Sequence, residues 1–264
     1  SSGYAFLQPN ETVLSNSVGT AGPEVEFKVD QKGEIIYRSP GNFMGYYKND
    51  KETKKILDKD GWIKSGDFGT INDNGHLSVI DRLVDKGKIN SALIFTPQSI
   101  ENKLKQSLFI QDAIVSGNGK DFVTAIIVVD PESLGSHLEK AGVGFSGYID
   151  LSQQDMGFDL IKKDIDKLNE ELGKTETFSA LQVKRFTILH KQLDSIDGEL
   201  TQTGKLRRKE VNKRFKKVID ALHSEKDTVE LASNPKTEKS AGKGRKVVLK
   251  IRNTKFNDKN GLDS

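Results

Sequence analysis

The stretch from Gly61 to Arg82 restricts the fold most strongly, because it predicts a β-hairpin with charged side chains near its ends. One strand is expected to end before an Asn74-Gly75 turn, and His76 to Ile80 returns with alternating side chains. Asp67 and Arg82 then lie near the ends of the hairpin, beside a glycine that lets a ligand approach the backbone. The stretch therefore predicts a strand-rich unit that carries a candidate ligand site.

The composition favours small cores with much solvated surface. A length of 264 residues allows one large or two small domains, and 34% apolar with 30% charged residues is a polar balance for a folded chain. The absence of cysteine excludes disulfides and thiolate metal ligands and fits a cytoplasmic location. A net charge of +3 is close to balance, so a nucleic-acid partner is not implied.

A second hairpin is expected earlier in the chain. Val25 to Val29 alternates, Gln31-Lys32-Gly33 forms a turn, and Glu34 to Arg38 returns, which predicts one buried face. Residues 1–81 therefore read as one β-rich unit.

After Arg82 the pattern changes to strands that alternate with helices. Leu83 to Ile94 is rich in Lys, Gly and Asn and is expected to form a loop, after which Thr96 and Pro97 begin a helix. Further strands and helices follow, as strands at Ile110–Ser116, Phe122–Val129 and Gln182–Leu189, and helices from Asp130 and over Leu160–Leu172. This β-β-α-α-β order describes a small α+β domain.

A second informative motif runs from Asp197 to Lys209 and contains Thr-Gln-Thr-Gly-Lys-Leu-Arg-Arg. Gly204 gives the backbone the freedom to place Lys205 at a loop tip. An amphipathic helix is expected to follow, with its apolar face formed by Val211, Phe215, Val218 and Leu222.

These motifs together resemble those of AMP-forming long-chain acyl-CoA synthetases, which belong to the adenylate-forming enzymes. The matching pieces are the Ser-Gly-Asp that ends at Asp67, the Asp-Arg that ends at Arg82, the Phe-Thr-Pro-Gln-Ser-Ile-Glu that begins at Phe95, and Thr-x-x-Gly-Lys-x-x-Arg around Lys205. They occur in the family's order and at domain-sized distances.

The resemblance implies an α+β chain made of a β-rich remnant of a large N-terminal domain and a small lid. Residues 1–81 would form the remnant, 82–223 the lid, and 224–264 a polar tail in which Thr228–Leu231 and Val247–Ile251 pair as a marginal hairpin. The implied reaction joins a fatty acid to CoA, with ATP converted to AMP and pyrophosphate through an acyl-adenylate. The implied partners are therefore fatty acid, ATP, AMP and CoA, together with the missing N-terminal domain.

The resemblance also assigns roles to particular residues. Asp67 would accept the ribose hydroxyls and Arg82 would add a fixed positive charge near the ribose or phosphate. Lys205 would be the catalytic cation beside the substrate carboxylate and the α-phosphate. The hinge between the two units would lie at Leu83, Val84 and Asp85. Mg²⁺ is expected for the complete enzyme, but no metal site is identified in this chain.

The sequence departs from the family pattern in three places. Ser17 to Pro23 resembles the family's phosphate loop, but Glu24-Val25-Glu26 stands where lysine should follow, so the true loop is expected to be absent and the chain alone inactive. Val84 replaces a frequent lysine of the hinge. Ser91-Ala92 replaces a glycine pair and would narrow the loop that flanks the pantetheine tunnel.

The alternative is a non-catalytic module that binds an anionic partner, either RNA or an acidic membrane. The basic run from Lys205 to Lys217 and the polar tail would form its surface, and peripheral contact with a membrane is compatible with both functions. Binding dominated by phosphate contacts would depend steeply on salt, whereas a nucleotide lid would not.

Overall fold

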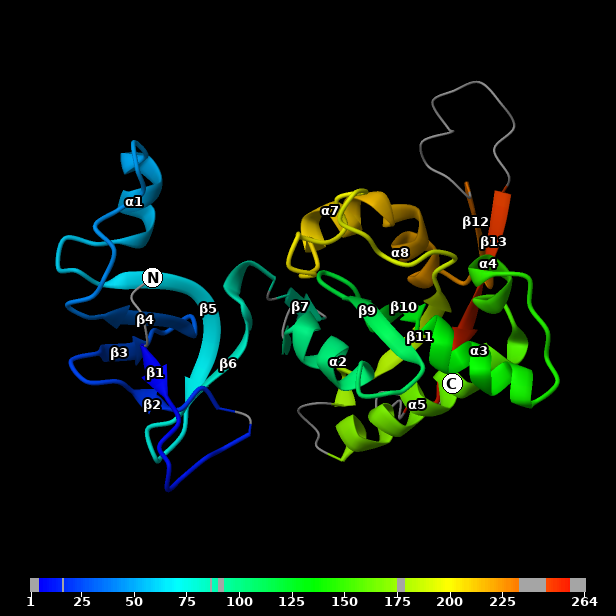
Figure 1. The fold of residues 1–264 in the computed structure, drawn as a ribbon, viewed down its shortest axis with the longest axis horizontal. Helices are drawn as coiled ribbons and strands as arrows, with labels where there is room; N and C mark the ends of the chain where they lie inside the picture. The colour runs from blue at the N-terminus through cyan, green and yellow to red at the C-terminus, as the bar shows by residue number, and fades with distance from the viewer. Residues whose placement is uncertain are drawn as a thin grey trace, which may run out of the picture. The chain divides into compact units, whose positions relative to one another are not determined.

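The computed structural model describes residues 5–15, 17–85, 87–89, 93–174, 179–232 and 246–256. The chain divides into two compact units, residues 1–86 and residues 87–264 (Figure 1). This division falls directly after the segment that the sequence analysis assigns to the hinge. No helix in the described ranges combines the length and apolar character needed to cross a bilayer.

The first unit is built on a four-stranded antiparallel sheet in the order β3-β4-β5-β6. Its elements are β1 (Phe6–Leu7), β2 (Thr20–Ala21), β3 (Glu26–Val29), β4 (Glu34–Arg38), α1 (Asp50–Ile56), β5 (Ile63–Ile71) and β6 (Leu77–Arg82). The predicted hairpin is confirmed as β5 and β6. In its turn Gly75 has a φ of 76°, and Asn72 Oδ1 accepts the N–H groups of Asn74 and His76 at 3.1 and 2.9 Å.

The second unit is built on a five-stranded sheet in the order β12-β13-β11-β10-β9. β10 and β11 are parallel, and the other neighbouring strands are antiparallel. Its strands are β7 (Gly87–Ile89), β8 (Leu93–Phe95), β9 (Ile110–Ser116), β10 (Val123–Val129), β11 (Val183–Ile188), β12 (Thr228–Ala232) and β13 (Lys246–Asn253). Its helices are α2 (Pro97–Leu104), α3 (Pro131–Lys140), α4 (Tyr148–Leu151), α5 (Asp155–Gly173), α7 (Arg208–Arg214) and α8 (Lys216–Leu222).

Strand β10 forms the centre of the second unit because every one of its residues is buried. A continuous apolar run of this kind is typical of a strand that is covered on both faces. One face packs against α2, α3 and α5, where Ile161 and Ile165 are fully buried. The other face packs against α7 and α8 through Val211 and Val218. The predicted α+β fold class is confirmed.

Three local expectations differ from the structure. The segment expected to be a loop before Ile94 instead contains a short 3₁₀ turn at Leu83–Asp85 and the β7–β8 hairpin, because Ile89 and Phe95 are buried in the core. The single helix expected after Lys205 is two helices, which meet at Phe215. Strands β12 and β13 do pair with each other, and β13 also pairs with β11 as part of the main sheet. Ser91 and Ala92 lie outside the described residues.

Candidate functional site

The first candidate site lies on the β5–β6 hairpin, where the strand register places Asp67 opposite Arg82. Arg82 Nη1 donates to Asp67 Oδ1 at 2.7 Å, while the two side chains stay 57% and 30% exposed. Gly66 adopts a φ of 71°, and a Cβ atom there would lie 3.4 Å from the Arg82 guanidinium. The glycine is thus needed for the backbone conformation, whereas a Cβ atom there would make only an ordinary contact with the arginine.

Neighbouring groups surround the Asp67 carboxylate without saturating it. The Asp67 N–H donates to Ser65 Oγ at 3.0 Å, which fixes the backbone at this position. Burial raises the pKa of the Tyr37 phenol, and the negative charge of Asp67 raises it further. Within the described part of the chain, the carboxylate accepts a hydrogen bond from Arg82 alone, so it retains acceptor capacity for a ligand.

The second candidate site is the tip of a tight loop in the second unit. The N–H of Thr201 donates to the carbonyl of Lys205 at 2.8 Å, and the N–H of Gly204 donates to the carbonyl of Thr201 at 3.0 Å. The Lys205 N–H also donates to Thr201 Oγ1 at 3.0 Å. Gly204 has a φ of 74°, as the tight turn requires. The loop therefore has a defined backbone rather than an open one.

The Lys205 side chain is exposed at this tip. Among the described residues, none forms an ion pair or hydrogen bond with its ammonium, so the charge is available to a ligand. Leu200 and Leu206 pair across the base of the loop and pack against the core beneath α7 and α8. Packing at the base thus supports an exposed cation at the tip.

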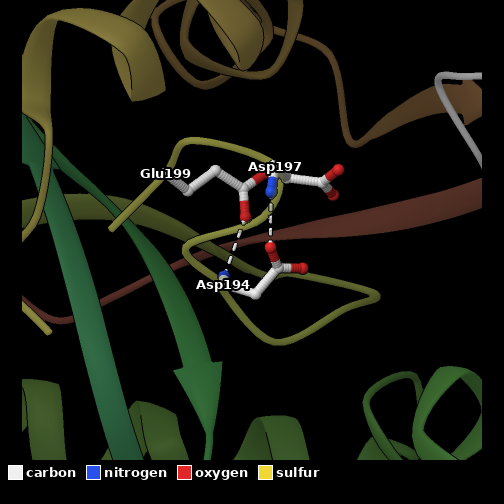
Figure 2. Close-up of side chains that lie close together, drawn as sticks. All are labelled: Asp194, Asp197 and Glu199. Atoms are coloured by element: carbon white, nitrogen blue, oxygen red, sulfur yellow. Dashed lines mark hydrogen bonds between the residues drawn. The ribbon is translucent and has the colours of Figure 1, made fainter. Parts of the chain in front are cut away.

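Three carboxylates lie close together just before this loop (Figure 2). Figure 2 shows that the N–H of Asp197 donates to Asp194 and that the N–H of Asp194 donates to Glu199. Lys191 Nζ lies 2.6 Å from Asp197 and 2.9 Å from Glu199, and Arg214 lies 2.8 Å from Glu199. Burial lowers the pKa of Lys191, but its hydrogen bonds to these two carboxylates outweigh burial and raise the pKa above its ordinary value.

The carboxylate cluster does not fit a divalent cation, although its oxygen atoms are close enough to bind one. The ammonium of Lys191 and the guanidinium of Arg214 already neutralise its two most buried members. A metal ion would have to displace a cation that these groups hold. The cluster therefore acts as an anchor for the base of the Lys205 loop, and it gives no support for a Mg²⁺ site.

Sequence reasoning missed one buried ion pair next to the same loop. Arg208 donates two hydrogen bonds to Glu101, both of 2.7 Å, and the two side chains are 12% and 6% exposed. Both residues belong to motifs that carry the family resemblance, which was the available signal. Their 107-residue separation hid the contact.

Two histidines of the second unit have shifted pKa values, the half-buried His223 and the buried His190. Burial, together with the charge of Lys120, lowers the pKa of His223 from its ordinary 6.5 to about 4. Its Nε2 lies 3.3 Å from Ser116 Oγ and 3.2 Å from Thr124 Oγ1, so the neutral ring shares hydrogen bonds with two hydroxyls. Burial also lowers the pKa of His190. Both rings are neutral near pH 7, which favours a structural role.

The predicted site residues thus fall into two groups. Asp67 and Arg82 form one pair in the first unit, and Lys205 lies at its own loop in the second. Leu83 to Asp85 form the 3₁₀ turn between them in the sequence. Segment Ser17 to Pro23 contains strand β2, and Gly19 bridges to Leu77, so this part of the chain is sheet structure rather than a phosphate loop.

Comparison with known proteins identifies the class. Residues 90–227 match the family described as AMP-binding enzyme C-terminal domain, and the chain belongs to that family. The fold of the chain also resembles the adenylation domain of a carboxylic acid reductase from Segniliparus rugosus, solved with AMP and a co-purified carboxylic acid. That likeness has a TM-score of 0.59 at 21% identity, covers 76% of this chain and 32% of the other, and shows the fold alone.

The curated relatives narrow the class further. The chain is 34% identical to long-chain-fatty-acid–CoA ligase 5 of Rattus norvegicus over 75% of its own length. It is also 34% identical to long-chain-fatty-acid–CoA ligase 1 of Homo sapiens over 73% of its length. The resemblance to long-chain acyl-CoA synthetases is therefore confirmed. The chain spans only 28% and 27% of the length of these two relatives.

Proposed function

We propose that this chain is the C-terminal part of a long-chain fatty-acid–CoA ligase. The complete enzyme would convert a fatty acid, ATP and CoA into acyl-CoA, AMP and pyrophosphate through an acyl-adenylate. The observation that carries the proposal is the exposed ammonium of Lys205, which has no partner in the described part of the chain and lies on a hydrogen-bonded loop of the unit that matches the family. A cytoplasmic location with peripheral membrane contact is part of the same proposal.

Each site residue has a role that follows from its chemistry. The free acceptor capacity of Asp67 suits the two hydroxyls of a ribose, and Arg82 orients the carboxylate while adding positive charge. Lys205 would neutralise charge that builds on the substrate carboxylate and the α-phosphate during attack. Leu83, Val84 and Asp85 would act as the hinge that moves Lys205 relative to the nucleotide.

ATP and CoA would both act as substrates, and Mg²⁺ would accompany ATP in the complete enzyme. Because Lys191 and Arg214 already neutralise the two most buried carboxylates of the acidic cluster, no step is assigned to a metal held by this chain.

The alternative, an anionic-partner module, is weaker because three of the eight basic residues in the run form internal ion pairs with other described residues. Arg208 pairs with Glu101, Arg214 pairs with Glu199, and Lys216 pairs with Asp220 at 2.5 Å. The positive surface is thus smaller than the sequence count indicates, which counts against RNA as a partner.

The experiment that tests the proposal separates the two half-reactions in a complete ligase, made by joining this chain to the ATP-binding region of a long-chain relative. Lys205→Ala should slow adenylate formation by about 10² to 10³, since one preorganised charge at the reacting group typically contributes that much. Preformed acyl-adenylate should still react with CoA. Single-turnover kinetics measure both steps.

The matched control is Lys209→Ala, which removes an exposed lysine just beyond the loop. It should leave both half-reactions unchanged. Equal effects of the two substitutions, or a Lys205→Ala defect in the thioester step alone, would contradict the role of Lys205. When the unjoined chain is assayed with palmitate, ATP and Mg²⁺, its rate of pyrophosphate release should equal the background rate. Clear turnover would overturn the expectation that the chain is inactive alone.

A further inference from the structure

The Arg208–Glu101 ion pair joins the two helical layers of the second unit. Arg208 begins α7, which packs on one face of the sheet, and Glu101 lies in α2, which packs on the other. Figure 1 shows strand β9 between these two helices. The two side chains meet through parallel hydrogen bonds, Nη1 to Oε1 and Nη2 to Oε2, each 2.7 Å long. The pair therefore links the two helices across the edge of the sheet that β9 forms.

The same carboxylate is also tied to the backbone of that edge. Strand β9 is an edge strand, so some of its N–H groups have no neighbouring strand to accept them. Glu101 Oε1 accepts one of these, the N–H of Val115, at 2.9 Å. A carboxylate held by a backbone donor and by a bidentate guanidinium has little freedom to rotate. Arg208 is thus held by a carboxylate that is itself hydrogen-bonded to the backbone of the sheet.

The Lys205 loop lies between this ion pair and the carboxylate cluster. On the earlier side, Lys191 and Arg214 hold Glu199, and the carbonyl of Glu199 accepts the N–H of Arg207 at 2.8 Å. On the later side, Arg208 is held by Glu101. The loop tip is therefore anchored at both ends by buried charges, although the tip itself is exposed.

We propose that Arg208 and Glu101 are positioning residues for Lys205. Their pairing fixes the C-terminal end of the loop. The Lys205 ammonium is therefore carried on a rigid loop when the second unit closes as a lid. This inference rests on the proposed function for its catalytic meaning. A fixed cation stabilises developing charge with little reorganisation, and small misplacement of such a group is costly in rate.

The first experiment measures the loop directly in the 264-residue chain. Backbone ¹⁵N order parameters of Gly204 and Lys205 should fall from the rigid range of about 0.85 toward about 0.6 in Arg208→Gln and in Glu101→Gln. Glu101→Gln keeps an acceptor oxygen for Val115 while removing the charge. Since both variants break the same pair, the double variant should resemble either single one.

The matched control is Arg207→Gln, which changes the exposed neighbour of Arg208. Its order parameters at the loop should equal those of the unmodified chain. If a Gln variant fails to fold, Arg208→Lys serves instead, because lysine keeps the charge but loses the bidentate fork. Unchanged loop order in a folded variant would overturn the positioning role. This measurement requires no ligase activity, so its failure is distinct from failure of the proposed function.

The second experiment asks whether the loosened loop affects chemistry in the complete ligase. Arg208→Lys should slow adenylate formation by about tenfold or more, while preformed acyl-adenylate reacts with CoA at the normal rate. A general folding defect would slow both steps together. Loop order that falls without any change in adenylate formation would overturn the catalytic part of the inference. Loss of both half-reactions in equal measure would do the same.

Discussion

The two units each contain an arginine–carboxylate pair with an N–O distance of 2.7 Å, yet the pairs differ in every other respect. Asp67 and Arg82 share one hydrogen bond on an open hairpin and stay 30% and 57% exposed. Glu101 and Arg208 share two and are 6% and 12% exposed. The contrast teaches that distance alone does not define a role. The charges of the exposed pair are accessible to a ligand, whereas those of the buried pair are enclosed in the folded unit.

The largest effect on stability is expected when one member of the buried pair is removed. Arg208→Ala should lower the free energy of unfolding of the second unit by about 3–5 kcal/mol, because it leaves the Glu101 carboxylate buried without its cation. Urea denaturation followed by far-UV circular dichroism measures the loss.

The chain contains its own control for that experiment. Its single tryptophan, Trp62, lies in the first unit, where Lys28 Nζ is 4.2 Å from the ring centroid. Trp62 fluorescence should therefore report an unchanged transition in Arg208→Ala. A shift of the fluorescence transition as large as the dichroism shift would show that the two units do not unfold independently.

Acid should also weaken the second unit, through His223. The folded pKa of about 4 lies below the ordinary 6.5, so the unfolded chain binds the proton more readily and stability falls as pH drops from about 6.5 toward 4. Allowing for the partly solvated ring, we expect a loss of about 1 kcal/mol between pH 7 and pH 5. Urea midpoints at the two pH values measure it.

His223→Gln keeps a hydrogen-bonding side chain beside Ser116 and Thr124 but cannot titrate. It should reduce the pH dependence to what the remaining groups supply, which include His190, whose pKa is also lowered by burial. An undiminished dependence in this variant would rule out His223 as the main source.

The smallest stability effect is expected at the exposed pair. Asp67→Asn should change the unfolding of the first unit by less than about 1 kcal/mol, since an exposed ion pair contributes little. In the complete ligase the same change should raise KM for ATP, because the amide is a poorer acceptor for the ribose hydroxyls. Asp73→Asn, at an exposed turn position, is the control. A large loss of stability without any change in KM would reverse the contrast between the two pairs.

Local signals predicted much of the secondary structure. The Asn74-Gly75 turn and its flanking strands appear as expected, and α2 begins at Pro97 after Thr96. The prediction of α3 from Asp130 is also confirmed, since its carboxylate accepts the N–H of Ser133 at 2.8 Å. These features depend on a few neighbouring residues, so a short window of sequence contains the information.

Features that depend on distant partners were missed. The sequence predicted only that Thr228–Leu231 and Val247–Ile251 pair as a marginal hairpin, because no local pattern indicates that β13 also pairs with β11, where Arg185 lies opposite Asn253. The β7–β8 hairpin was expected to be a loop, because its polar composition conceals that Ile89 and Phe95 are buried beneath the sheet.

The basic run around Lys205 contains both features that the sequence predicts and features that depend on the tertiary structure. The sequence by itself determined that a glycine turn would carry a lysine into an amphipathic helix, because backbone freedom and side-chain spacing are local properties. The sequence could not distinguish the cations that are exposed to solvent from those that form buried ion pairs. Only the tertiary structure decided that Arg208 is buried against Glu101, 107 residues away, while Lys205 is exposed and has no partner within the described ranges.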